Sequence, residues 1–195
     1  MESVYNETYY SACNNDYRKH FRFQVAALLR AIYIKWVFHP QAVLDVGCGM
    51  GNLVEMLRKL GIKALGIEVS DYALSQVPKN LREFFKKGSI TAIPFEDDAF
   101  DVVTSVDVLE HVATVDIPKA LQECARVAKR GMFHEIATLE DKRVIGKDPT
   151  HVSKYRAQWW FEQFRTQLPD WEVRHGPRIP IFKNGVFVLG SRTEG

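Results

Sequence analysis

The spacing of hydrophobic residues changes from a helical to a strand-like pattern early in this chain of 195 residues. Between Tyr17 and Trp36, apolar side chains recur every three or four positions, which predicts one amphipathic helix. His39-Pro40 is expected to end this helix, because proline cannot continue one. The apolar stripe of the helix, which we expect to face the core, consists of Phe21, Val25, Leu28, Leu29, Ile32 and Trp36.

Beyond this helix, short apolar runs alternate with helical patterns. Gly61 is expected to be the C-cap of the first following helix, and Ser70-Asp71 the start of the next. This alternation predicts a mainly parallel sheet that is covered by helices on both faces. The apolar runs predict strands at residues 42–46, 64–69, 84–86, 100–106 and 132–136.

The last fifth of the chain has a different pattern. A helix over residues 156–167 carries Trp160 and Phe164 on one face, which predicts that these two side chains are buried. Two strands, at residues 171–174 and 185–189, are joined by a loop that is too short for a crossover helix. They are therefore expected to pair antiparallel.

The composition is that of an ordinary folded domain. Hydrophobic residues make up 46% of the chain and charged residues 26%. The length favours a single domain over residues 1–195. Residues 1–16 are expected to form a polar arm, for which two interpretations stay open: a lid over a bound ligand, or a packed or disordered segment.

Charge and cysteine usage narrow the class of partner. Charges of both signs are interspersed and the formal net charge is only +2, so no nucleic-acid partner is expected. Cys13, Cys48 and Cys124 show no disulfide or zinc spacing, which fits a reducing compartment. The chain has no signal region and no apolar run of membrane-spanning length, so we expect a cytoplasmic protein without a membrane partner.

The candidate chemistry begins at the glycine-rich turn after the first strand. Gly47, Gly49 and Gly51 follow Asp45, and glycines at this point let the backbone approach a ligand closely. In open α/β sheets, ligands bind beyond the carboxyl ends of the strands. A dinucleotide-binding motif would have its third glycine at position 52, where this chain has Asn52, and this disfavours a nicotinamide-dependent dehydrogenase.

An acid follows at the end of the second strand. Glu68 is placed to accept hydrogen bonds from the two ribose hydroxyls of an adenosine group. A glycine turn alone, or an acid alone, is equally consistent with a structural turn and a solvated side chain. Their occurrence together, directly after two apolar strands, favours a nucleoside-binding site.

The segments VLDVGCGMGNL, ALGIEVS and IPFEDDAFDVVTSVDVLEHV together resemble the class I S-adenosylmethionine-dependent methyltransferase family. The resemblance covers about residues 42–136. It implies a Rossmann-like, three-layer α/β sandwich with a seven-stranded, mostly parallel sheet whose last strand is antiparallel. It also implies S-adenosylmethionine as the cofactor, with the three glycines cradling its methionine and ribose portions, Asp45 supporting them and Glu68 holding the ribose.

The adenine contact departs from the family pattern. Many family members have an Asp after the glycine at the end of the third strand, whereas here Gly88 is followed by Ser89 and Ile90. The Ser89 hydroxyl and the Ile90 backbone N–H can still make hydrogen bonds to the base. Val69 and Asp107 complete the predicted cofactor contacts.

Candidate catalytic groups lie beyond the fourth strand. We predict Glu110, His111 and His151 as candidates to remove a proton from the methyl acceptor. A structural role, in which these side chains order loops, is an equally good interpretation. His134 lies on a strand and is expected to be a buried, hydrogen-bonded histidine.

We expect no metal site, although the small-RNA 3′-end methyltransferases resemble this chain in combining carboxylates and histidines, which they use to hold a divalent ion. The favoured function is transfer of a methyl group to an oxygen or nitrogen of a small-molecule acceptor, such as a sugar or a secondary metabolite. The alternatives are an RNA or protein methyltransferase, and a protein that binds S-adenosylmethionine without turnover.

Overall fold

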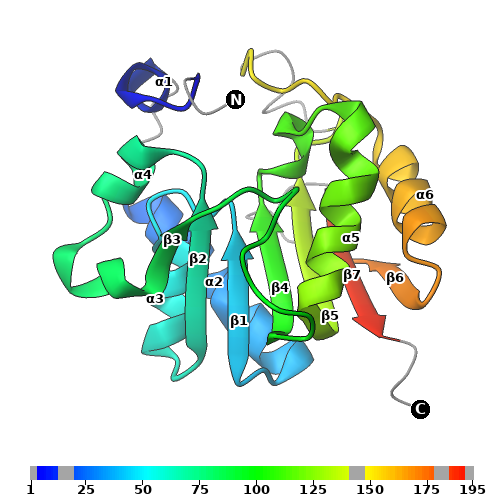
Figure 1. The fold of residues 1–195 in the computed structure, drawn as a ribbon, viewed down its shortest axis with the longest axis horizontal. Coiled ribbons are helices and arrows are strands. Elements are labelled where there is room, and N and C mark those ends of the chain that lie inside the picture. Colours follow the sequence, from blue (N-terminus) through cyan, green and yellow to red (C-terminus); the bar gives the residue numbers. More distant parts are fainter. Residues whose placement is uncertain (1–3, 13–19, 141–147, 178–184, 192–195) are drawn as a thin grey trace. The chain divides into compact units, whose positions relative to one another are not determined.

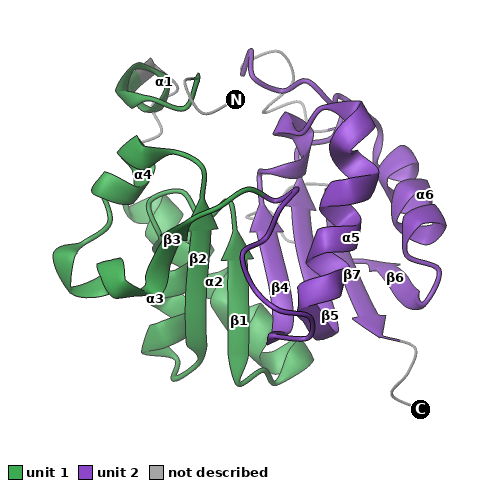
Figure 2. Ribbon diagram, viewed as in Figure 1, with its two compact units in different colours: residues 1–89 green, residues 90–195 purple. Residues whose placement is uncertain are grey.

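The computed structural model of the chain describes residues 4–12, 20–140, 148–177 and 185–191. The chain divides into two compact units, residues 1–89 and residues 90–195 (Figure 2). The helices are α1 (Glu7–Ala12), α2 (Phe21–Phe38), α3 (Asn52–Lys59), α4 (Asp71–Ser75), α5 (Ile117–Val127) and α6 (Ala157–Gln167). The strands are β1 (Ala42–Val46), β2 (Lys63–Glu68), β3 (Phe85–Lys87), β4 (Phe100–Val106), β5 (Ala128–Ile136), β6 (Trp171–His175) and β7 (Gly185–Ser191).

The first unit contains three parallel strands in the order β3-β2-β1 (Figure 1). Residues 43–46 of β1 are all buried, which explains why this strand is a nearly continuous apolar run. Asp45 pairs in register with Gly66 of β2. The parallel register brings the carboxyl ends of β1 and β2 together, and with them the glycine turn and Glu68.

Two local signals in the first unit are confirmed. Gly61 ends α3 with φ of 84°, and its N–H donates to the Arg58 carbonyl at 2.9 Å. Ser70 caps α4, because its hydroxyl oxygen accepts a hydrogen bond from the Ala73 N–H at 3.1 Å. Both helix ends are determined by residues that are close together in the chain, so the sequence alone is enough to predict them.

The orientation expected for α2 is wrong. The stripe that was expected to face the core lies on the outer side of the helix: Phe21 is 83% and Trp36 72% exposed, Leu28 and Leu29 are also exposed, and Val25 and Ile32 are half-buried. The buried side consists instead of Ala26, Ala27 and Ala31 together with Ile34. The small alanines allow a close approach to the neighbouring elements, and α2 packs against α3.

The second unit contains four strands in the order β4-β5-β7-β6. β4 and β5 are parallel, whereas β7 is antiparallel to both β5 and β6. The antiparallel pairing predicted for the last two strands is therefore confirmed. In Figure 1, α5 lies in front of β4 and β5.

Aromatic side chains fill the core of the second unit around α6. Trp160 and Phe164 are fully buried, as the helical pattern predicted. The Phe164 ring lies 5.1 Å from the ring of Phe187 on β7. Trp159 is only half-buried and stacks on Tyr155 with ring centroids 3.7 Å apart, so it faces away from this core.

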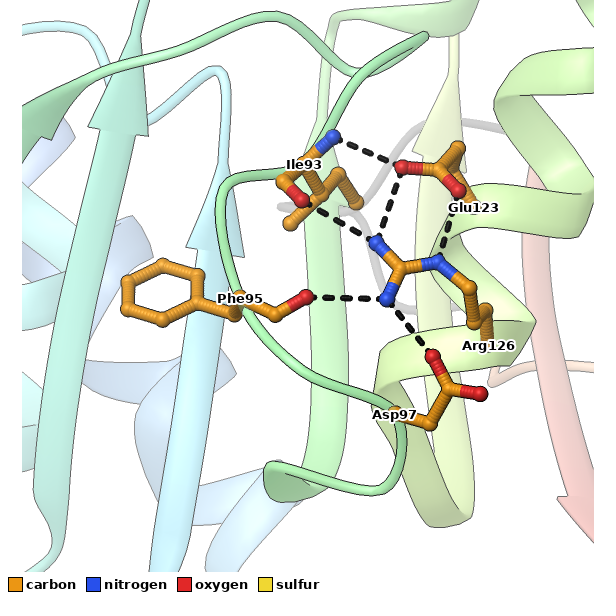
Figure 3. Close-up of polar contacts among 5 residues, drawn as sticks. All are labelled: Ile93, Phe95, Asp97, Glu123 and Arg126. Atoms are coloured by element: carbon orange, nitrogen blue, oxygen red, sulfur yellow. Dashed lines mark hydrogen bonds and ion pairs between the residues drawn. The ribbon is translucent and has the colours of Figure 1, made fainter.

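An arginine fixes the loop that leads into β4 (Figure 3). The Arg126 guanidinium donates to the carbonyls of Ile93 and Phe95 and to the carboxylates of Asp97 and Glu123. Glu123 also accepts a hydrogen bond from the Ile93 N–H at 2.8 Å. The planar guanidinium can serve these several acceptors at once, which fastens the loop to α5.

Two expectations about the whole chain are tested by the described part. Cys48 and Cys124 are buried free thiols, and Cys13 lies outside the described residues. No helix among the described residues has both the length and the apolar character needed to cross a bilayer.

Candidate functional site

The glycine turn after β1 has left-handed backbone geometry at each of its glycines. The φ angles are 69° at Gly47, 53° at Gly49 and 84° at Gly51. The turn is tied to β2, because the N–H groups of Gly47 and Cys48 both donate to the Ile67 carbonyl, at 2.8 and 3.0 Å. A β-carbon built on Gly49 would meet no atom within 4 Å, so open space lies beside the backbone there.

Glu68 connects this turn to the end of β2. Its Oε2 accepts a hydrogen bond from the Gly49 N–H at 2.9 Å, and its Oε1 accepts from the N–H groups of Val69 and Ser70 at 2.8 and 3.0 Å. Burial raises the pKa of this carboxyl, while the three N–H donors oppose the rise. Each carboxylate oxygen can accept more than one hydrogen bond, so Glu68 retains capacity for ribose hydroxyls.

The other predicted cofactor residues of the first unit lie around the same turn. Asp45 is buried at the end of β1. Desolvation first, then the charge of Glu68 and then that of Asp45, raise the pKa of the buried Cys48 thiol. The Gly88 N–H donates to the Glu68 carbonyl at 3.1 Å, which holds the end of β3 beside β2. Ser89, half-buried, ends the first unit.

Ile90 and Asp107 belong to the second unit. The Ile90 side chain is buried. Asp107 has a positive φ of 56°, and its N–H donates to the Glu135 carbonyl at 2.8 Å. The predicted contacts of Ser89, Ile90 and Asp107 with the cofactor remain predictions.

The N-terminal arm packs against the elements that carry this site. Tyr10 of α1 is buried in a cluster with Met50 of the glycine turn and Ala73 of α4. The Ser70 hydroxyl donates to the Tyr5 carbonyl. Desolvation first, and then the charge of Glu68, raise the pKa of Tyr10, so its phenol stays protonated. The sequence indicated residues 1–16 as a possible lid but gave no sign of the contact between Tyr10 and Met50.

The second unit brings together the candidate catalytic residues. Glu110 and His111 lie in the 3₁₀ turn η3 (Leu109–His111). The Glu110 carboxylate accepts a hydrogen bond from the Ala137 N–H at 2.9 Å. Its backbone carbonyl accepts from the N–H groups of Val152 and Ser153, both at 3.0 Å. Glu110 thus holds the segment next to His151 in place.

His111 and His151 lie side by side with ring centroids 4.6 Å apart. His111 Nδ1 is 2.9 Å from the Thr150 hydroxyl, which in turn donates to the Asp148 carboxylate. Burial, and then the neighbouring His151, lower the pKa of His111 to about 4. His111 is therefore neutral near pH 7 and can accept a proton or bind an ion through a ring nitrogen.

This group also has the composition of a metal-binding site. One ligand atom from each of Glu110, His111 and His151 lies within 4.8 Å of the others. A carboxylate and two imidazole groups suit divalent transition metals. The sequence pointed to the three residues, but their proximity depends on contacts between segments about 40 positions apart.

His134 uses only part of its hydrogen-bonding capacity within the described residues. It is fully buried, its Nδ1 lies 2.8 Å from the Ser105 hydroxyl, and its ring stacks on Phe164. Its Nε2 has no hydrogen-bond partner among the described residues. Burial lowers the pKa of His134 to about 3, so the ring is neutral and belongs to the core rather than to the candidate site.

We predict that Gly49→Ala and Gly61→Ala have different effects on cofactor binding. Both glycines have positive φ and open space beside them, so each substitution should cost about 1 kcal/mol of stability through backbone strain. Only the methyl group at position 49 would intrude on S-adenosylmethionine, the cofactor that the sequence resemblance implies, so calorimetry should show at least about a tenfold affinity loss for Gly49→Ala alone. Equal affinity losses in the two variants would contradict this assignment of the turn.

We further predict that Glu68→Gln weakens S-adenosylmethionine binding by about 10- to 100-fold, since charge-assisted hydrogen bonds are lost. Glu83→Gln, an exposed position in the same unit, serves as the control and should bind normally. S-adenosylhomocysteine with and without its ribose hydroxyls separates the two roles of Glu68. Wild-type protein should discriminate between the two compounds and Glu68→Gln should not. If the variant discriminates equally well, Glu68 orders the turn without holding the ribose.

Comparisons with known proteins identify a methyltransferase domain in this chain. A family model described as a methyltransferase domain matches residues 44–134, from β1 to β5. The ubiquinone biosynthesis O-methyltransferase of Thiobacillus denitrificans is 38% identical over 122 residues, which cover 57% of this chain and 52% of the relative. The norajmaline N-methyltransferase of Rauvolfia serpentina is 27% identical over 186 residues, covering 80% of this chain and 63% of the relative. The chain spans about half the length of the ubiquinone biosynthesis relatives it matches.

A solved structure shows the same fold. Magnesium protoporphyrin IX methyltransferase from Synechocystis PCC 6803, with bound S-adenosylhomocysteine, superposes with a TM-score of 0.72 over 98% of both chains, at 16% identity. The fold class predicted from the sequence is thus confirmed, including the antiparallel last strand. The match of residues 44–134 to the methyltransferase domain model, together with the glycine turn and the acid after β2, supports the resemblance to the class I S-adenosylmethionine-dependent methyltransferase family.

Proposed function

We propose that this chain is an enzyme that transfers a methyl group from S-adenosylmethionine to an oxygen or nitrogen of a small-molecule acceptor. The observation that carries the proposal is the Glu68 carboxylate, which binds the Gly49 N–H at the end of the parallel strands β1 and β2. Relatives named as an O-methyltransferase and as an N-methyltransferase support a small acceptor of either kind.

The first unit would hold most of the cofactor. The open space beside Gly49 and the acceptor oxygens of Glu68 suit the methionine and ribose portions. Asp45 would support the glycine turn, because its side chain is buried directly before the turn and is not free to reach solvent. The proposed cofactor contacts are Asp45, Gly47, Gly49, Gly51, Glu68, Val69, Ser89, Ile90 and Asp107.

The chemistry needs little from the side chains beyond placement and a proton acceptor. Bound S-adenosylmethionine supplies an electrophilic methyl group. The chain orients the acceptor, excludes water and takes up the proton that the acceptor oxygen or nitrogen loses. We propose that His111 accepts this proton, because its ring is neutral near pH 7 and is oriented by the Thr150 hydroxyl. Glu110 and His151 position it.

A second role for the same residues is supported by their geometry. Glu110, His111 and His151 would bind a divalent cation that holds the acceptor oxygen, in place of a proton-accepting histidine. The two roles exclude one another at His111, because a ring nitrogen bound to an ion cannot also accept a proton.

The arm and the domain organisation belong to the same proposal. We propose that residues 1–195 form one methyltransferase domain, since the family model extends across both units. Residues 4–12 would cover the bound cofactor, because Tyr10 already packs against Met50 of the glycine turn. The two buried free thiols support a cytoplasmic location.

The first test of function is binding and transfer with the intact chain. Calorimetry should show binding of S-adenosylmethionine and S-adenosylhomocysteine and no binding of NAD. Cofactor with a labelled methyl group should then transfer its label to the small-molecule fraction of a cell extract, and not to RNA or protein. Labelling of RNA or protein would replace the proposed acceptor class, and binding without any transfer would leave a cofactor-binding protein.

The second test concerns His111. His111→Ala should lower turnover by about 100-fold or more while cofactor affinity changes less than about twofold, because the loss of a proton acceptor affects only the chemical step. His175→Ala is the matched control, an exposed histidine of the same unit, and should keep full activity. A chelator should leave the wild-type rate unchanged if His111 accepts the proton. Inhibition that an added divalent ion reverses would instead establish the metal role.

A further inference from the structure

The exposed side of α2 carries an apolar surface that the fold itself does not use. Phe21 is 83% exposed and Trp36 72%, while Leu28 and Leu29 are each 37% exposed. Large apolar side chains gathered on one face usually mark a contact with something outside the protein. The core does not require them, because the buried side of α2 is formed by three alanines and Ile34.

Helical geometry gathers these side chains into one continuous stripe. With 3.6 residues per turn, successive side chains are rotated by about 100°, so the six apolar residues fall within an arc of about 100°. The arc lies opposite the buried alanine side. We call this surface the α2 stripe. It consists of the exposed residues Phe21, Leu28, Leu29 and Trp36 and the half-buried residues Val25 and Ile32.

Cations border the α2 stripe at both of its edges. By the same rotation, Arg22 falls next to one edge of the arc and Lys35 next to the other, and both are exposed. Phe21–Phe38 contains Arg22, Arg30 and Lys35 but no Asp or Glu. The Arg22 guanidinium lies over the Phe23 ring and Lys35 Nζ donates to the Leu60 carbonyl. Both side chains are long and exposed, so their cationic ends can turn to lipid headgroups instead.

We propose that the α2 stripe binds an anionic lipid surface, with α2 lying in the plane of the interface. Aromatic and aliphatic side chains would enter the boundary between headgroups and acyl chains, and the flanking cations would meet the anionic headgroups. Trp36 and Phe21, at the two ends of the stripe, are of the types that anchor interfacial helices. This proposal replaces the expectation of no membrane partner, which rested on the lack of a spanning segment, because an interfacial helix does not need spanning length.

Charge and area both disfavour a second copy of the chain as the occupant. Two α2 helices packed together through this face would bring four cations, Arg22 and Lys35 of each copy, to one interface with no acid on either helix. An 18-residue helix is about 27 Å long and about 10 Å wide, so one face offers roughly 270 Å². A stable protein interface buries about 800 Å² per partner. A lipid surface has no such minimum area and supplies the missing negative charge.

The test is sedimentation of the full chain with vesicles of phosphatidylcholine alone or mixed with phosphatidylglycerol. Wild-type protein should bind the mixed vesicles at least about tenfold more tightly, and added salt should reduce the difference. Trp36→Ala should lower binding to mixed vesicles by about tenfold, and Arg22→Gln by about fivefold. Val115→Ala removes an 85% exposed apolar side chain from the other unit and should bind like the wild type.

The variants should keep wild-type unfolding curves, because each position is exposed, and these measurements need neither cofactor nor acceptor. The result therefore does not depend on the proposed enzyme activity. Lack of binding to mixed vesicles would overturn the proposal. So would equal binding by Trp36→Ala and the wild type. A concentration-dependent dimer that Trp36→Ala dissociates, without vesicle binding, would assign the α2 stripe to a second copy.

Discussion

The site depends on one buried carboxylate and the backbone groups around it. Glu68 is 6% exposed and accepts hydrogen bonds from the N–H groups of Gly49, Val69 and Ser70. A buried charge is tolerated only where such donors replace its water, so the acid and the turn require each other. The glycines after β1 meet that requirement, because their positive φ angles aim the Gly49 N–H at the acid. A nucleoside-binding surface follows from the same arrangement.

The second unit uses a buried acid in a related way. Glu110 is fully buried and accepts the Ala137 N–H through its carboxylate, while its carbonyl accepts from Val152 and Ser153. These bonds join segments that are distant in sequence, and they bring His151 to within ring contact of His111. Glu110 is thus occupied in organising loops, which favours His111 as the group that meets the acceptor. A residue can be indispensable to a site without touching its substrate.

The parts of the structure that were predictable from sequence are the local ones. The bounds of β4, the Gly61 helix end, the Ser70 cap and the turn with its acid each depend on residues close together in the chain. The contacts of His111 with Thr150 and of Tyr10 with Met50 link positions about 40 apart, so no periodicity could indicate them. For α2, the periodicity grouped the right residues on one face but could not say which face is buried. Alanines proved better partners for close packing than the larger side chains.

The unexpected orientation of α2 bears on the function of the protein. If stability alone had shaped α2, small or polar residues at its outer face would serve as well, because Ala26, Ala27 and Ile34 already complete the buried side. Keeping Phe21 and Trp36 in contact with water forgoes the stabilisation of about 2–3 kcal/mol that burying each would give. It also adds a risk of non-specific association. Neither the cofactor turn nor the histidine pair needs these side chains. The explanation for the α2 stripe therefore lies outside the folded chain, at a surface that is both apolar and negatively charged.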